Sequence, residues 1–266
     1  MKSFLLLLCL LSFPLWSQTK LLSWNLADFG QSKTEATMAF IAATVKDYDI
    51  VAIQEVVAGP GGAQAVAALA GILNRSGSHW DYTISDKTTG SAYKTERYAF
   101  LWQTARVKKI GKAWLEKQYG TLIDREPYYC TFEKNGKQFT VAGFHAITKN
   151  RQPETEIKYF RFLPQQYPNR NLLFAGDFNC PQSHSVFNPL KKMGYVPALT
   201  KQKTSLKKQC RGNDCLASEF DNIFYDTQTI QILNAGAINF YRQFNSLSEA
   251  RRISDHLPVW MVFTIQ

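Results

Sequence analysis

Carboxylate, amide and imidazole side chains recur in this sequence where apolar runs begin or end. The clearest case is Gly176-Asp-Phe-Asn179, in which Asp177 and Asn179 directly follow the apolar run 171–175. Six other short segments repeat the pattern, with Asn25, Glu55, Glu96, His145, Asp221, Asp255 and His256. Because strand ends can meet at one rim of a sheet, we expect these side chains to converge in one cleft.

These residue types suit metal-assisted hydrolysis with acid and base catalysis. Carboxylates such as Glu55 and Asp255 are the ligands that Mg²⁺ or Mn²⁺ prefers. Close cysteine and histidine clusters, which would favour zinc, are missing from the sequence. Of four histidines, His145 and His256 fall within the segments above. Since histidine titrates near neutrality, one can act as base and the other as acid, and the pattern leaves the order open.

Each of these residues also has a purely structural interpretation. Asp177 and Asn179 could cap a turn, where both residue types are favoured. Glu55 could be an exposed acid, Glu96 and Asp221 could form surface ion pairs, and the two histidines could be hydrogen-bonded core residues. The ordered set of segments favours the functional interpretation over these alternatives.

Apolar, β-rich runs alternate with helical patterns, which predicts a mixed α/β architecture with some antiparallel pairing. Strands are expected at 20–26, 49–54, 97–103, 128–134, 138–145, 171–175, 220–226 and 256–263. Helices are expected at 34–46, from a turn at 59–62 to about residue 74, and at 153–166. Asn135-Gly136 predicts a hairpin. No repeat or linker divides the chain, so we expect one domain over residues 18–266.

The first 17 residues predict a secretory signal peptide. Lys2 precedes an apolar run from Phe4 to about Leu15, and small or polar residues follow it. The run is short for a membrane span, although an uncleaved anchor is the alternative. No other segment is apolar enough to cross a bilayer, so we expect a secreted or periplasmic protein with no membrane association after cleavage.

Because an exported chain meets an oxidising environment, its cysteines are expected to form disulfides. Without Cys9 four remain, an even number in an oxidising compartment, and they allow three pairings. The spacing of Cys210 and Cys215, with Gly212 and Asn213 between them, favours a bridge that closes a small loop. A metal knuckle is the weaker alternative.

The formal net charge is +10, and the basic residues cluster at 106–112, 201–211 and 251–252. Such an excess in an exported protein indicates a polyanionic partner, because neutralising phosphates releases counterions. A solubilising charge or attraction to an anionic cell surface would give the same composition.

The ordered motifs resemble the endonuclease/exonuclease/phosphatase superfamily over nearly the whole mature chain. They are Trp-Asn25, Gln-Glu55, Glu96-Arg-Tyr, Phe-His145, Gly-Asp177-Phe-Asn179, Phe-Asp221-Asn-Ile and Ser-Asp255-His256. The segments 93–98 and 125–127 are similar to the deoxyribonuclease I branch. The resemblance implies a four-layer sandwich of two mixed β-sheets flanked by helices, and a monomeric, metal-dependent endonuclease that cuts DNA with little sequence preference.

The resemblance also implies a role for each residue. Glu96 would orient His145, and Asp221 would orient His256. Glu55, Asp255, Asn25 and Asp177 would bind Mg²⁺ or Mn²⁺, and a structural Ca²⁺ ion is compatible with the family. Asp177 would also help to position or deprotonate the attacking water. Asn179, Asn25, Arg125 and Tyr93 would contact the substrate.

One departure from the family pattern concerns DNA binding. An arginine commonly follows the Gln-Glu-Val motif in relatives that enter the minor groove, whereas Val57 follows it here. Groove insertion at that point is therefore not expected, and Tyr93 or a basic residue of 201–211 is expected to contact DNA instead. The alternatives are a sphingomyelinase or inositol phosphatase of the same superfamily, and a non-catalytic DNA-binding protein.

Overall fold

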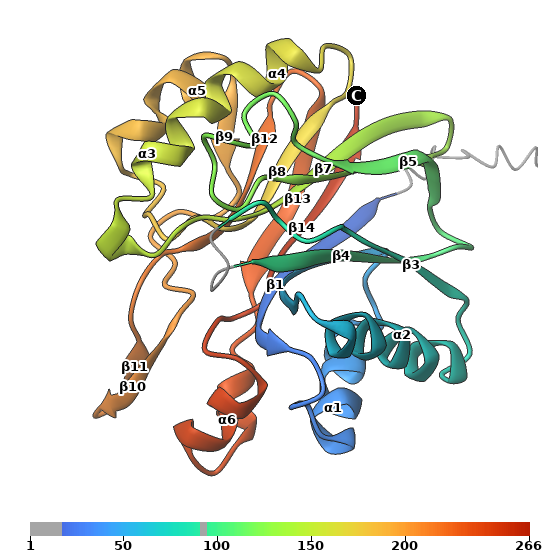
Figure 1. Ribbon diagram of the computed structural model, residues 1–266, viewed down its shortest axis with the longest axis vertical. Helices are drawn as coiled ribbons and strands as arrows, with labels where there is room; N and C mark the ends of the chain where they lie inside the picture. The colour runs from blue at the N-terminus through green and yellow to red at the C-terminus, as the bar shows by residue number, and fades with distance from the viewer. Residues whose placement is uncertain (1–17, 91–94) are drawn as a thin grey trace, which may run out of the picture.

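The computed structural model describes residues 18–90 and 95–266. Two six-stranded sheets pack face to face, and helices cover the outer face of each (Figure 1). The predicted sandwich of two mixed sheets flanked by helices is confirmed. The signal peptide expected at 1–17 and the substrate contact expected at Tyr93 lie outside the described residues.

The first sheet contains β1 (Thr19–Phe29), β2 (Ile50–Val57), β3 (Trp80–Ile84), β4 (Glu96–Gln103), β13 (Ile230–Ala237) and β14 (Val259–Ile265). Its strand order is β13-β14-β1-β2-β4-β3. The second sheet contains β5 (Lys108–Leu115), β6 (Tyr128–Lys134), β7 (Lys137–His145), β8 (Leu172–Asp177), β9 (Tyr195–Pro197) and β12 (Asp221–Asp226). Its order is β5-β6-β7-β8-β12-β9. The strands β10 (Leu206–Arg211) and β11 (Asp214–Leu216) form a separate hairpin.

The α-helices are α1 (Glu35–Val45), α2 (Pro60–Arg75), α3 (Glu154–Ile157), α4 (Leu163–Gln166), α5 (Asn188–Lys192) and α6 (Leu247–Ile253). Short 3₁₀ helices are η1 (Lys149–Arg151), η2 (Lys158–Phe162), η3 (Ser185–Phe187) and η4 (Phe240–Gln243). Helix α1 starts after Thr34, whose side chain accepts a hydrogen bond from the Thr37 amide, as expected for a helix cap.

The apolar core has three parts that match the layers. Side chains such as Phe100 and Phe132 fill the space between the two sheets. Helices α1 and α2 cover the outer face of the first sheet, and α3 to α5 cover that of the second (Figure 1). On β1, Leu21 belongs to the core between the sheets and Leu22 to the core under α1 and α2. The inner strands are therefore apolar on both faces, which explains their uninterrupted apolar runs.

Some elements differ from the sequence expectation for identifiable reasons. The helix expected at 153–166 is divided into α3, η2 and α4, since it contains Pro153 and Pro164, and Pro164 is the second residue of α4. The turn expected at 59–62 is largely the first turn of α2, which Pro60 begins. Strands β3, β5, β9 and β13 and the β10–β11 hairpin were not expected. In β5 and β13 few residues are buried and no apolar alternation marks the strand.

The expected disulfide between Cys210 and Cys215 is confirmed, and it joins β10 to β11. Cys130 and Cys180 are buried and free. Disulfides are typical of proteins outside the reducing cytosol. Within residues 18–90 and 95–266, no helix combines the length and the apolar character that a membrane crossing requires.

Gly176 illustrates how the fold constrains the Gly-Asp-Phe-Asn segment. It has a φ of +153° and pairs with Phe144 in the parallel β7–β8 ladder, where an added Cβ would overlap the Phe144 carbonyl. Gly176→Ala is therefore expected to lower the free energy of unfolding by about 3 kcal/mol or more, as measured by urea denaturation. Gly71→Ala, in the interior of α2, is the matched control and is expected to raise it by about 0.5 kcal/mol. Equal stabilities of the two variants would contradict this interpretation.

Candidate active site

One end of the second sheet presents three of the expected residues. β7 ends at His145 and β8 ends at Asp177, and these two residues are paired in the parallel register. Asp221, the first residue of β12, pairs with Asp177 from the other side. The convergence expected from strand ends therefore occurs for these residues.

The first sheet brings Asn25, Glu55 and Glu96 to the same place. Glu55 has a φ of +60°, and the β2–β4 register shifts between Ile53 and Val56. Such a bulge redirects a side chain, and a non-glycine residue with positive φ often marks a functional position. The Glu55 amide donates to Glu96 Oε1 at 3.2 Å, so the bulge and the start of β4 support each other.

His145 is held between two carboxylates. Its Nδ1 lies 3.0 Å from Glu96 Oε2, and its Nε2 lies 3.4 Å from Asp177 Oδ2. Arg125 Nη1 donates to the same Glu96 oxygen at 3.1 Å, so Glu96 is fixed from two sides. The buried Tyr98 hydroxyl accepts from the His145 amide and donates to the Arg125 carbonyl. The imidazole is thus fixed in orientation.

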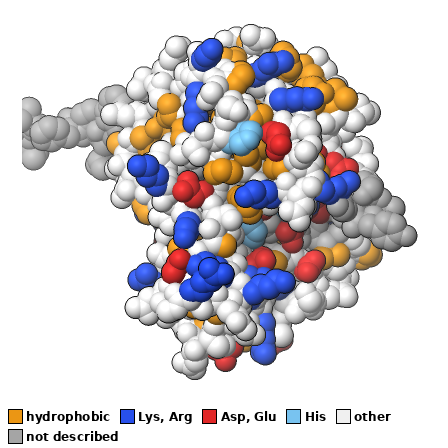
Figure 2. All heavy atoms as spheres, turned by 90° about the vertical axis from the view of Figure 1, so that its left-hand side faces the viewer, with side chains coloured by type: hydrophobic (Ala, Val, Ile, Leu, Met, Phe, Trp, Pro, Cys, Tyr) orange, Lys and Arg blue, Asp and Glu red, His pale blue; other side chains and the backbone are white. Residues whose placement is uncertain are grey.

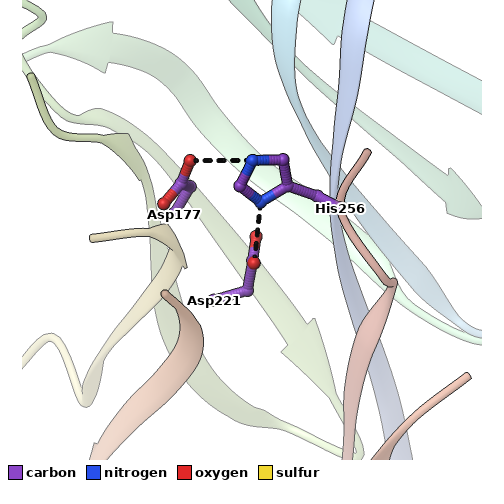
Figure 3. Close-up of side chains that lie close together, drawn as sticks. All are labelled: Asp177, Asp221 and His256. Carbon is purple, nitrogen blue, oxygen red and sulfur yellow. Dashed lines mark hydrogen bonds and ion pairs between the residues drawn. The ribbon is translucent and has the colours of Figure 1, made fainter. Parts of the chain in front are cut away.

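His256 has a closely similar environment (Figure 3). Its Nδ1 lies 2.8 Å from Asp221 Oδ2, and its Nε2 lies 3.6 Å from Asp177 Oδ2. The His256 amide donates to Ser254 Oγ, and its carbonyl accepts from Trp24 Nε1. Both histidines therefore present Nε2 to the same carboxylate oxygen.

Asp177 is the centre of this arrangement and is almost completely buried. Its Oδ2 also accepts from Asn25 Nδ2 at 3.2 Å, and its Oδ1 accepts from the Asn179 amide at 2.8 Å. Asn179 has a φ of +48°, and its Nδ2 donates to the Ala146 carbonyl at 3.0 Å. One buried oxygen thus links both histidines and Asn25.

The buried acids change the pKa values of the histidines. Burial lowers the pKa of His145, but the Glu96 carboxylate raises it above its usual value of 6.5. For His256, burial is likewise outweighed by Asp221 and Asp177, which raise its pKa well above that value. Burial raises the pKa of Asp221 to about 6. At Asp177 burial is outweighed by the two imidazoles, and the pKa is lowered.

These shifts predict how the stability of the metal-free protein depends on pH. Because the native state binds the histidine protons more tightly than the unfolded chain, the free energy of unfolding should be highest below the unfolded pKa of 6.5 and should fall above it. The slope should be at most about 1.4 kcal/mol per pH unit for each histidine. Urea denaturation in EDTA between about pH 6.5 and pH 8.5 measures it. His256→Gln should reduce the slope, and a stability that rises across this range would contradict the assignment.

The oxygen atoms at the site suit a hard divalent cation. Glu55, which is partly exposed, accepts from Asn25 Nδ2 at 2.9 Å, and Asn25 Oδ1 is buried without a hydrogen-bond partner within the described chain. A cleft of about 500 Å³ is lined by Asp28, Glu55, Glu96 and Arg125, among others. A partnerless amide oxygen beside two carboxylates fits a magnesium or manganese ligand set.

A second group, Asp177, Asp221 and His256, is also compact enough to hold an ion. There, however, Asp221 Oδ2 already accepts from Thr204 Oγ1 at 2.7 Å and faces His256 Nδ1. Mg²⁺ prefers oxygen ligands, and Asp177 belongs to both groups, so the choice depends on the other members. Asn25 Oδ1 has no partner within the described residues, whereas Asp221 Oδ2 has two, and we therefore favour the group that contains Glu55 and Asn25.

Two expected site residues have internal partners. Asp255 Oδ2 pairs with Arg251 Nη2 at 3.1 Å, and no hydrogen bond or ion pair joins Asp255 to Glu55, Asn25 or Asp177. Arg125 is buried, and its guanidinium donates to Glu96 and to the Ala146 carbonyl. Its Nε is buried without a partner within the described residues, and the residue lines the cleft.

Sequence reasoning missed three supporting residues. Thr204 Oγ1 donates to Asp221 and accepts from the Asp221 amide, although Thr204 lies 17 positions away. Tyr98 and Ser254 lie inside the Glu-Arg-Tyr and Ser-Asp-His motifs, and their position in those motifs was the available signal. No pattern marked Thr204, because its role depends on the loop before β10.

Comparisons with known proteins agree with this geometry. The model of the endonuclease/exonuclease/phosphatase family matches residues 22–256. A deoxyribonuclease of Thioalkalivibrio sp. (strain K90mix) is 28% identical, with 97% of this chain and 74% of that protein covered. Human deoxyribonuclease gamma is 26% identical, with coverages of 96% and 88%.

Solved structures show the same fold. An endonuclease/exonuclease/phosphatase family protein from Bacteroides thetaiotaomicron superposes with a TM-score of 0.69 at 16% identity, over 94% of this chain and 98% of that one. Since the family model spans both sheets and all the motifs at their ends, this chain belongs to the endonuclease/exonuclease/phosphatase family and is distantly related to deoxyribonucleases.

Proposed function

We propose that this chain is an exported endonuclease that hydrolyses phosphodiester bonds of DNA with little sequence specificity and requires a divalent metal ion. The supporting observation is the pair of imidazoles that face Asp177 Oδ2 through Nε2 while a buried carboxylate lies on each Nδ1. DNA is the proposed substrate because both related enzymes above are named deoxyribonucleases. The basic charge of the chain suits the same polyanion.

The two carboxylates fix how each imidazole can exchange protons. Glu96 and Asp221 favour the tautomer with the proton on Nδ1, which leaves Nε2 free to accept or donate one. One histidine takes a proton from the attacking water, and the other gives a proton to the leaving oxygen. Asp177, between the two Nε2 atoms, positions that water.

Further residues are assigned to phosphate and metal binding. Asn179 and Arg125 donate to the phosphate, together with Asn25 and Tyr93. Glu55, Asn25 and Asp177 would hold Mg²⁺ or Mn²⁺, and Asp255, which pairs with Arg251, would be a further ligand. When bound, the ion supplies positive charge against the phosphoryl oxygens. We assign the mature chain, residues 18–266, to the secreted or periplasmic space as a monomer. A Ca²⁺ ion would bind in addition and serve a structural role.

A substrate panel tests this function. The mature chain is incubated with supercoiled plasmid, with sphingomyelin and with an inositol phosphate, each in Mg²⁺, Mn²⁺ or EDTA. We expect nicked and then linear plasmid with either metal and none in EDTA. DNA that stays intact while either of the other substrates is hydrolysed would reject the nuclease assignment, and DNA binding without any hydrolysis would indicate a non-catalytic protein.

A further inference from the structure

The β10–β11 hairpin lies outside both sheets. It projects from the body of the protein beside α6 (Figure 1), and the Cys210–Cys215 disulfide joins its strands near the tip. The tip residues from Lys208 to Asp214 are all exposed. Leu206 and Leu216 pack in the core at the base of the hairpin, whereas the tip has no hydrophobic face. A hairpin without such a face is marginally stable, so the disulfide provides the rigidity of the tip.

The hairpin and the segment before it are strongly basic. The segment from Lys201 to Leu216, both included, contains five lysine or arginine residues and a single acid, Asp214. Lys203 and Lys207 both pair with this acid. Lys208 and Arg211 are exposed, and no carboxylate of the described chain lies within ion-pair distance of either. Two uncompensated charges therefore remain toward the tip.

The base of the hairpin is attached to the candidate active site. The Leu206 amide donates to the Asp255 carbonyl at 2.7 Å, and Ser205 forms a β-bridge with His256. Arg251 Nη1 donates to the carbonyls of Leu206 and Lys207. These contacts thus hold the base of the hairpin in place next to His256.

The candidate active site contains charges of both signs. Glu55, Glu96, Asp177 and Asp221 are acids, and Arg125 donates to Glu96 there. Positive charge on the surface beside the site attracts a polyanion such as DNA. Figure 2 shows lysine and arginine side chains spread over the face it presents, with acidic side chains between them.

We propose that the disulfide-closed hairpin binds the sugar-phosphate backbone of DNA away from the reacting phosphate, through Lys208 and Arg211. This inference rests on the proposed function and names the surface that holds its substrate. The six residues of β10 span about 20 Å at about 3.3 Å per residue. That length corresponds to roughly six base pairs of B-DNA. The hairpin therefore contacts long DNA and leaves small phosphodiesters untouched.

The test compares two double variants with the same change in charge. Lys208→Glu/Arg211→Glu alters the hairpin, and Lys108→Glu/Lys112→Glu alters exposed lysines of β5, on the other side of the molecule in Figure 1. Binding of a fluorescent 30-base-pair duplex is measured by anisotropy in Mg²⁺, with His256→Ala added to every protein to prevent cleavage. We expect the hairpin variant to weaken binding about tenfold near 0.1 M salt, and the slope of log K against log salt to fall by about two. The control should change by less than about twofold.

Two further measurements separate this inference from the proposed function. With His256 intact, the hairpin variant should raise the KM for duplex DNA and leave turnover of bis(4-nitrophenyl) phosphate unchanged. Lys208→Gln/Arg211→Gln removes the two charges without reversing them, so it should change the logarithm of the dissociation constant about half as much as the glutamate variant does. Duplex binding that is equal in hairpin and control variants overturns the inference, even if the protein cuts DNA. Absence of cleavage contradicts the proposed function, while the binding comparison still decides whether the hairpin holds DNA.

Discussion

Replacing His256 by alanine is expected to lower kcat for plasmid cleavage in Mg²⁺ about 10³-fold. The substitution removes the Nε2 that faces Asp177 at 3.6 Å and the Nδ1 that faces Asp221 at 2.8 Å. General acid or base catalysis by one positioned side chain contributes about 10²- to 10⁴-fold, so the loss of either role falls in this range. The KM for DNA should change little, because the imidazole is 12% exposed and faces protein carboxylates.

His184→Ala provides the matched control for this prediction. His184 is exposed, and its Nδ1 accepts a hydrogen bond from the Val186 amide at the start of η3, so kcat should stay within about twofold of the parent. His256→Ala leaves Asp221 buried without its imidazole, which costs about 3 kcal/mol, so both proteins are assayed well below their unfolding temperatures. Cleavage at the parental rate by folded His256→Ala would remove His256 from the mechanism.

The sequence predicted the members of the site because its polar residues interrupt apolar strands. His145, Asp177 and Asp221 each stand at a strand end, and strand pairing alone places them side by side. The family resemblance paired Glu96 with His145 and Asp221 with His256, and each pair lies within hydrogen-bond distance. The catalytic roles themselves stay predictions.

Other features depend on contacts that no local pattern reveals. Glu55 points into the site because β2 carries a bulge, which depends on the register of β4. Asp255 looks like a metal ligand in its motif, yet its carboxylate pairs with Arg251 one helical turn before it. Beyond Leu206 and Leu216 at its base, the β10–β11 hairpin is exposed and lacks an apolar alternation, so only its cysteines and turn residues marked it.

The two sheets contribute different halves of the proposed chemistry. The first sheet supplies Asn25, Glu55 and Glu96, and the second supplies His145 and Asp177. Direct hydrogen bonds join the halves, from Asn25 to Asp177 and between Glu96 and His145. Because these contacts cross the sandwich, a change in sheet packing would alter proton transfer and metal binding together.

Asp177→Asn is expected to lower kcat about 10³-fold, because it removes the charge that both imidazoles face and that would hold the proposed metal ion. Asparagine is as large as aspartate, so Asn25 and Asn179 can each keep one hydrogen bond to residue 177. The same carboxylate raises the pKa of His145 and of His256. The variant should therefore also shift both histidine titrations to lower pH, which NMR of the metal-free protein can measure.

The shift of the two histidine titrations distinguishes an electrostatic role of Asp177 from a simple loss of packing. Asp226→Asn, at the opposite end of β12 from Asp221, is the control and should change neither kcat nor the titrations. A folded Asp177→Asn protein with unshifted histidines would show that the carboxylate does not interact with them. An unchanged kcat together with lowered histidine pKa values would remove Asp177 from water positioning and metal binding, and would leave Glu55 and Asn25 to hold the ion.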